Sequence, residues 1–265
     1  MVSLAIGGFY GIGAYTSAAM SIYAGAPFLI ALFCGIAITA VVATAISRLL
    51  VRMHGDYFAI ATFGLQMVLF SIFNSWLVLT RGPLGMSGIP RPSLFGWVVE
   101  SQIEFAGLTV VCAIAVFILL RRLTKSSYGR VLRAIREDEV LTASFGKNVL
   151  QVKAAAFAVS AACSAVAGVL YAHYISYIDP TMFTINESIL VITMVIVGGA
   201  ASPWGSIVGA AVIVLVPECL RFLNLPASSA AYLRQMIFGS FLLIAVMMRP
   251  RGLVGSYEIG RARSG

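Results

Sequence analysis

The chain has 265 residues, of which 60% are hydrophobic and 11% are charged, and its formal net charge is +8. Its mean hydropathy of +0.97 excludes a soluble globular domain, because one core cannot hide so much apolar surface from water. The positive charge carries no nucleic-acid meaning, since the sequence shows neither a known binding module nor basic residues interleaved with aromatic ones.

The apolar segments are long and continuous, without the two-residue alternation of a membrane barrel. They predict an all-α fold, a polytopic transmembrane helical bundle of about eight spans in one transmembrane domain, residues 1–265, because roughly 20 helical residues cross the hydrocarbon core. The expected spans are about 2–23, 27–47, 56–79, 105–120, 153–175, 187–200, 206–222 and 232–248. The sixth and seventh flank GGAASPWG, so residues 187–222 fit either two spans or one broken element.

The first segment, MVSLAIGGFYGIGAY, has no charged n-region and no cleavage site, so we expect it to remain as a span. Orientation follows from Lys and Arg, which stay on the cytoplasmic side during insertion. The most basic loop covers about residues 121–152, and placing it inside predicts that both termini are cytoplasmic. The segment ISYIDPTMFTINES carries no basic residue and is expected to be an outer loop.

No enzyme signature is complete in this sequence. The phosphate-binding pattern GxxxxGK[ST] fails at both ends around Gly146 and Lys147, so the chain is not expected to hydrolyse ATP. His54 and His173 lie on different segments, without an HExxH pattern or a Cys/His cluster, so no metal site is expected. Span centres lack the acidic residues that proton-coupled pumps use, which weakens a secondary transporter without excluding it.

The stretch SSYGRVLRAIREDEVLTASFGKN, residues 126–148, holds an unusual share of the chain's charge. Ser126 or Ser127 can cap a helix there. The apolar residues that follow recur at helical spacing on one face, and they are Tyr128, Val131, Leu132 and Ile135. A second short turn is expected to end at Gly146, and its apolar side holds Val140, Leu141, Ser144 and Phe145.

Two short amphipathic helices that are too polar to span need a surface to lie on. An anionic lipid surface is one alternative, and a solvated linker is another. Glu137, Asp138 and Glu139 favour a third alternative, a protein partner of mixed charge, because a purely lipid-binding helix avoids negative charge in its middle.

The same stretch, continued to Ala172, resembles the permease subunits of branched-chain amino acid ABC importers. Other segments resemble that family in the same order along the chain, and they are GGFYGIGAYTSA, GDYFAIATF, LTRGPLGMSGIP, VIVGGAASPWGSIVGA and MRPRGLVG. Members often carry additional helices before the first of these blocks, so we expect this chain either to lack an N-terminal part or to be naturally short there.

The resemblance implies a non-enzymatic permease in the bacterial cytoplasmic (inner) membrane, with a pathway for branched-chain or related neutral amino acids. The implied partners are a second homologous permease subunit, two cytoplasmic ATPase subunits that bind ATP, an extracytoplasmic substrate-binding protein and membrane lipid. Neither nucleic acid nor a cofactor in this chain is implied. Permeases for urea or short amides are similar to this family, and a self-contained channel or secondary transporter for a small polar solute is an alternative from another class.

The resemblance also implies that the charged loop couples the permease to its ATPase. The coupling residues that it implies are Arg130, Arg133, Arg136, Glu137, Asp138, Glu139, Ala143 and Gly146. Leu141, Thr142 and Lys147 depart from the family pattern, which leaves the choice of partner open.

Candidates for the translocation pathway come from GDYFAIATF and from glycine-rich segments that could supply irregular backbone at membrane depth. They are Gly55, Asp56, Tyr57, Phe58, Gly82, Gly85, Gly198, Gly199 and Ser202. Glycine and proline in such segments also make ordinary turns, so a purely structural role is an equal alternative.

Overall fold

The computed structural model describes residues 3–53, 55–94, 97–199 and 203–221, together with residues 236, 239 and 240. The chain divides into two compact units, Met1–Ser188 (unit 1) and Ile189–Gly265 (unit 2), and each is described by itself. Nearly all of the eighth expected span, 232–248, lies outside the described residues.

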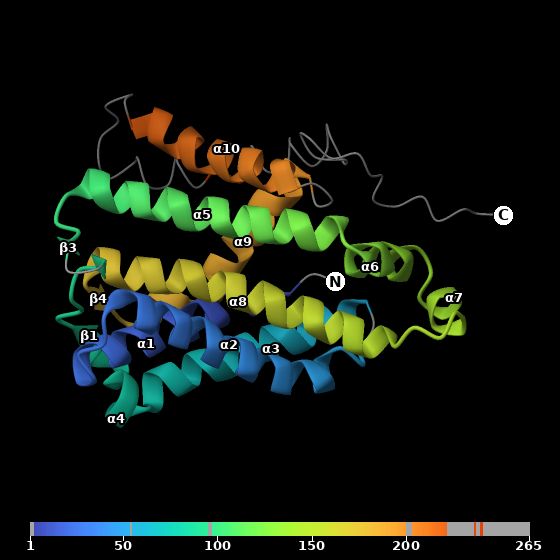
Figure 1. Ribbon diagram of the computed structural model, residues 1–265, viewed down its shortest axis with the longest axis horizontal. Coiled ribbons are helices and arrows are strands. Elements are labelled where there is room, and N and C mark those ends of the chain that lie inside the picture. Colours follow the sequence, from blue (N-terminus) through green and yellow to red (C-terminus); the bar gives the residue numbers. More distant parts are fainter. Residues whose placement is uncertain are drawn as a thin grey trace. The chain divides into compact units, whose positions relative to one another are not determined.

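Helices make up most of unit 1, as Figure 1 shows. They are α1 (Ile6–Tyr23), α2 (Phe28–Leu50), α3 (Asp56–Ser75), α4 (Leu77–Thr80), α5 (Gln102–Lys125), α6 (Ser127–Glu137), α7 (Glu139–Ser144) and α8 (Val149–Ile175). Two 3-10 turns, η1 (Gly82–Leu84) and η2 (Pro180–Phe183), interrupt the connections. The helix α9 (Ile185–Gly198) starts in unit 1 and continues into unit 2, which also holds α10 (Pro203–Arg221).

Within the described residues, 5 segments are long and apolar enough to cross a membrane, which confirms the expected helical membrane fold at this level. They are Phe28–Leu50, Asp56–Ser75, Gln102–Lys125, Val149–Ile175 and Pro180–Gly198. The apolar part of α10, Pro203–Leu215, is shorter than a span. The charged loop is shorter than the sequence predicts, because α5 continues to Lys125 and α8 already begins at Val149.

The helix α1 is absent from those five segments, yet it is the most deeply packed helix, with more than half of its 18 residues buried. Its small residues let other backbones come close: a Cβ at Gly168 of α8 would overlap the carbonyl oxygen of Tyr10. Ala5 and Phe9 cluster with Phe157, and Ala18 clusters with Ala172 further along, so α1 and α8 run parallel. Glycine and serine lower the hydropathy of α1 because it faces protein on most sides.

The helix α5 contrasts with α1 in how little of it is buried. Its N-terminus has a capping box in which the Ser101 hydroxyl accepts from the N–H of Ile103 and Glu104 reaches back to the N–H of Ser101. None of its 24 residues is buried within the described structure. Phe105, Leu108 and Cys112 pack partly against the core, and the exposed apolar side of the helix is expected to face lipid.

Two short antiparallel pairs stand at one end of the long helices of unit 1, and α6 and α7 stand at the other (Figure 1). The strand β1 (Met86–Ser87) pairs with β4 (Tyr177–Ile178), and β2 (Ser93–Leu94) pairs with β3 (Trp97–Val98). Close to the first pair, the Nδ1–H of His173 donates to the carbonyl of Pro90 at 2.8 Å, which holds the end of α8 to the preceding loop.

The sequence prediction that residues 175–188 form an outer loop is wrong for its second half. Phe183 is fully buried, with its ring 5.4 Å from that of Tyr10 and 5.5 Å from that of Tyr15. Ser188 is also fully buried. Phe183 and Ser188 therefore belong to the interior, and the count of charges by loop cannot distinguish such burial from an outer location.

Unit 2 brings α9 and α10 into close contact at glycines. A Cβ at Gly205 would lie 2.6 Å from the carbonyl oxygen of Gly198, so only hydrogen fits between the two backbones. The described part of residues 187–222 thus consists of two separate helices, with residues 200–202 outside the description.

Candidate functional site

The helix α6 forms from local signals. The Ser126 hydroxyl accepts from the N–H of Gly129 at 3.4 Å and donates to the carbonyl of Leu123 at 2.7 Å, so one side chain ends α5 and caps α6. The predicted apolar stripe is confirmed, because Ile135 is buried while Val131 and Leu132 are half-buried. The stripe directs one face of α6 inward and leaves its arginines outside.

Tyr128 fastens α6 to the start of α8. Its hydroxyl donates to the carbonyl of Val152 at 2.7 Å. Burial raises the pKa of the Tyr128 phenol above its ordinary value, so the group stays a protonated donor throughout the physiological range.

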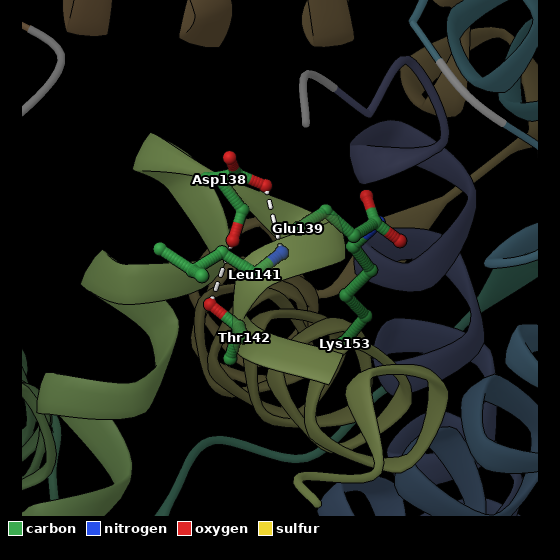
Figure 2. A network of polar contacts seen from close by, with 5 residues as sticks. All are labelled: Asp138, Glu139, Leu141, Thr142 and Lys153. Carbon is green, nitrogen blue, oxygen red and sulfur yellow. Dashed lines mark hydrogen bonds and ion pairs between the residues drawn. The ribbon is translucent and has the colours of Figure 1, made fainter. Parts of the chain in front are cut away.

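The helix α7 has its own cap and its own contact to α8, as Figure 2 shows. The Asp138 carboxylate accepts from the N–H of Leu141 at 2.9 Å, and the buried Thr142 hydroxyl donates to the Asp138 carbonyl at 2.7 Å. The Glu139 carboxylate forms an ion pair with the ammonium of Lys153, whose side chain is only 8% exposed. The ion pair holds α7 against the beginning of α8.

The outer side of α7 is apolar and exposed. Val140 is 77% exposed, Leu141 is 55% exposed and Phe145 is 75% exposed. The backbone at Gly146 has a φ of 73°, the left-handed conformation that ends helices, which confirms its predicted position. Within unit 1, α7 is therefore held to α8 on one side and exposes an apolar face on the other.

The coupling residues implied by the resemblance all lie along Ser126–Gly146, which we call the α6–α7 segment. Arg130 donates to the Ser127 hydroxyl at 2.8 Å, and Arg136 lies 3.6 Å from Glu137 across their charged groups. The other exposed members are Arg133, Ala143 and Gly146. Asp138 and Glu139 have internal roles that sequence reasoning did not anticipate: Asp138 stands at a cap position that the sequence could have indicated, whereas no sequence signal connects Glu139 to a lysine 14 residues later.

Four pathway candidates surround the start of α3. Gly55 precedes the helix with a φ of 56°, and Asp56 lies in its first turn, where a negative charge complements the helix dipole. Tyr57 is exposed. Phe58 is buried against Phe157, with ring centroids 6.0 Å apart, so its side chain belongs to the core.

The remaining candidates lie elsewhere. Gly82 and Gly85, with φ values of 58° and 67°, follow the opposite end of α3, about 30 Å from Asp56 at 1.5 Å per residue. Gly198 and Gly199 belong to unit 2, and Ser202 lies outside the described residues. The structure does not bring the four candidates at the start of α3 together with Gly82 and Gly85.

A polar network that the sequence reasoning missed lies where α1 begins. The fully buried Gln66 of α3 accepts from the N–H of Gly8 at 2.6 Å and donates to the carbonyl of Phe183 at 2.8 Å. Ser188 accepts from the N–H of Gly7 at 2.8 Å. Thr62 accepts from the N–H of Leu4 at 3.0 Å. Thr62 lies about 9 Å along α3 from Asp56, the first residue of that helix. The side chains of Gln66 and Ser188 accept from the first N–H groups of α1, which has no side-chain cap of its own. The sequence could have indicated the network by the lone glutamine inside an apolar span.

Comparison with known proteins gives one family over nearly the whole chain. Residues 1–247 match the family of branched-chain amino acid transport system permease components. The chain belongs to that family. No solved structure matches it.

Several of the similar proteins are permease proteins of high-affinity branched-chain amino acid transport systems. LivM of Salmonella typhimurium is 28% identical over 96% of this chain, and LivM of Escherichia coli is 30% identical over 96%. The chain spans 64% of the length of each of these two relatives. LivH of Salmonella typhimurium is 30% identical over 71% of this chain and 62% of its own length.

Proposed function

We propose that this chain is the membrane permease subunit of an ATP-binding-cassette importer. It forms part of a translocation pathway for branched-chain or related neutral amino acids and is driven by a separate ATPase. The family and the described apolar helices support the permease role. The LivM and LivH relatives support the substrate class.

The α6–α7 segment is the proposed coupling element, and one observation carries this role. A short helix that is held to α8 by the Glu139–Lys153 ion pair still exposes Val140, Leu141 and Phe145. Exposed apolar side chains on a polar loop outside the spans are typical of a protein interface. ATP is bound by the partner, which docks on this face.

The coupling test measures retention of the ATPase subunits during purification of the tagged permease, together with leucine uptake. Leu141→Ser with Phe145→Ser should reduce both at least tenfold, because apolar anchors at the centre of an interface often contribute 2 kcal/mol or more, which is roughly a factor of 30. Leu150→Ser is the control, since Leu150 is also exposed but lies outside α7. Unchanged ATPase retention in the double variant would refute the docking role.

The acidic residues need a separate variant, because Asp138 is a cap as well as a charge. Asp138→Asn removes the charge and keeps a side chain that caps well, whereas Asp138→Ala removes both. If the charge contacts the ATPase, both variants lose retention. If the cap alone matters, only Asp138→Ala loses ATPase retention.

The uptake assay also tests the substrate class. Leucine, isoleucine and valine should compete with one another, while urea and acetamide should not. Uptake that continues in membranes depleted of ATP would favour a self-contained channel or a secondary transporter instead.

The proposed assembly contains a second homologous permease subunit, two cytoplasmic ATPases and an extracytoplasmic binding protein, in the bacterial inner membrane. We also propose eight spans with cytoplasmic termini. Single cysteines at Ser127 and Ala24, both exposed, should label from opposite sides in a background without native thiols. Labelling from one side would contradict this topology.

A further inference from the structure

We propose that the junction of α5 and α6 binds the phosphate headgroup of an anionic membrane lipid. The junction holds a pocket of about 410 Å³ lined by Ile118, Arg121, Arg122, Lys125 and Ser126. This ligand is independent of the transported solute and of the docking role of α7.

The pocket lies at the depth where hydrocarbon gives way to headgroups. Along α5, the apolar run between Glu104 and Arg121 rises about 26 Å, close to the roughly 30 Å thickness of a bilayer core. Ile118, one turn before Arg121, is 46% exposed. Because no residue of α5 is buried in the described structure, lipid can approach the pocket along the helix.

Among the described residues, no acid forms an ion pair with the charged groups that line the pocket. Arg121, Arg122 and Lys125 are exposed, and the described residues that line the pocket include no acid. Nearby cations behave differently, since Arg136 lies beside Glu137 and Lys153 pairs with Glu139. Two guanidinium groups that line one pocket suit phosphate oxygens, which each can bind in a bidentate way.

The position favours a lipid over a protein partner. Ser126 lines the pocket, and both hydrogen bonds of its hydroxyl stay within the turn that connects α5 to α6. The apolar face of α7 lies beyond the far end of α6, an 11-residue helix about 16 Å long. The pocket instead continues the exposed apolar surface of α5, so the ligand that fits has a phosphate and an acyl chain.

The test measures lipid binding to the purified full chain by native mass spectrometry, with dioleoylphosphatidylglycerol and dioleoylphosphatidylcholine as probes. The chain should prefer the anionic lipid. Arg121→Gln with Arg122→Gln should weaken that binding roughly 10- to 30-fold, as expected for two cations near the membrane surface, and should leave the zwitterionic lipid unaffected. The control, Arg48→Gln with Arg52→Gln, makes the same charge change at the end of α2 and should have less than a threefold effect.

Arg121→Lys with Arg122→Lys keeps the charge but loses the bidentate geometry, so it should weaken binding less than the double glutamine variant does, which separates loss of the site from loss of folding. Equal weakening by the Arg48 and Arg52 control would overturn the proposal, because bulk charge would then explain the preference. Full competition by inorganic phosphate would assign the site to a free anion. Unchanged lipid binding with lost ATPase retention would assign it to a protein interface, and either result would overturn the proposal.

Discussion

Two regions differ in which side chains accept hydrogen bonds from their backbone N–H groups. One is the interior around the start of α1, and the other is the α6–α7 segment. The first turn of α1 depends on Gln66 and on Ser188, which is 181 residues away from Gly7 in the sequence. The α6–α7 segment depends on Ser126 and Asp138, each three residues before the amide that its side chain accepts from. The interior forms only when unit 1 assembles, whereas the segment can form locally.

This difference predicts where substitutions act. Changes in the interior should alter the amount and the stability of the folded protein, because one side chain serves several distant parts of the chain. Changes in the α6–α7 segment should alter its contacts to α8 and to a partner while leaving the bundle folded. The following variants test that division, from the largest expected effect to the smallest.

Gly168→Leu should prevent folding of unit 1. A Cβ there would overlap the carbonyl oxygen of Tyr10, and backbone cannot move aside as a side chain can. The cost should exceed the roughly 3 kcal/mol of ordinary overpacking, which is comparable to much of a domain's stability. Fluorescence-detected size-exclusion chromatography should show little monodisperse protein. Gly107→Leu is the control, since open space surrounds Gly107 on α5, and equal yields would contradict the packing of α1 on α8.

Gln66→Leu should lower the stability of the folded protein by about 2–5 kcal/mol. The substitution leaves the N–H of Gly8 and the carbonyl of Phe183 without their partner, and each unpaired buried group costs about 1–3 kcal/mol. Thermal unfolding in detergent measures the loss. Gln151→Leu changes an exposed glutamine and should shift the midpoint far less; similar shifts would mean that the network does not stabilise α1.

Glu139→Gln should destabilise the segment by about 1–3 kcal/mol, because it leaves the ammonium of Lys153 buried without a carboxylate. The cost is below that of a fully buried pair, since the Glu139 side chain is 32% exposed. Glu139→Gln with Lys153→Met should recover most of the loss, as a double-mutant cycle by thermal unfolding can show. Additive losses would mean that the two charges do not interact.

Tyr128→Phe should have the smallest effect, about 1 kcal/mol for one hydrogen bond. Because burial raises the pKa of the phenol, its contribution is complete below the ordinary tyrosine pKa of about 10 and is lost only as pH rises through the raised value. The stability difference from the unsubstituted chain should therefore be equal at pH 6 and pH 9. Tyr57→Phe, at an exposed position, is the control.

The same division explains what sequence reasoning could predict. Caps and helical periodicity are local, so the start of α6, its buried stripe with Ile135 and the end of α7 at Gly146 were accessible from the sequence. Hydropathy likewise predicted the long apolar helices.

The rest depends on contacts between distant segments. Burial of Phe183 depends on Tyr10 and Tyr15, and the role of Glu139 depends on Lys153. No local sequence pattern indicates these contacts between distant residues. For the pathway, glycine patterns predicted irregular backbone at Gly82 and Gly85, and the expected span 56–79 already placed Gly55 and Phe58 at the other end of the helix.

The contacts along α8 give that helix the geometry of an unequal lever. Tyr128 and Glu139 hold its first turn at Val152 and Lys153, and its backbone meets that of α1 at Gly168. At 1.5 Å per residue, Lys153 lies about 23 Å from Gly168, and His173 lies about 8 Å beyond it. A rigid tilt of α8 about that crossing would reduce a displacement imposed at α7 to about a third at the contact between His173 and Pro90.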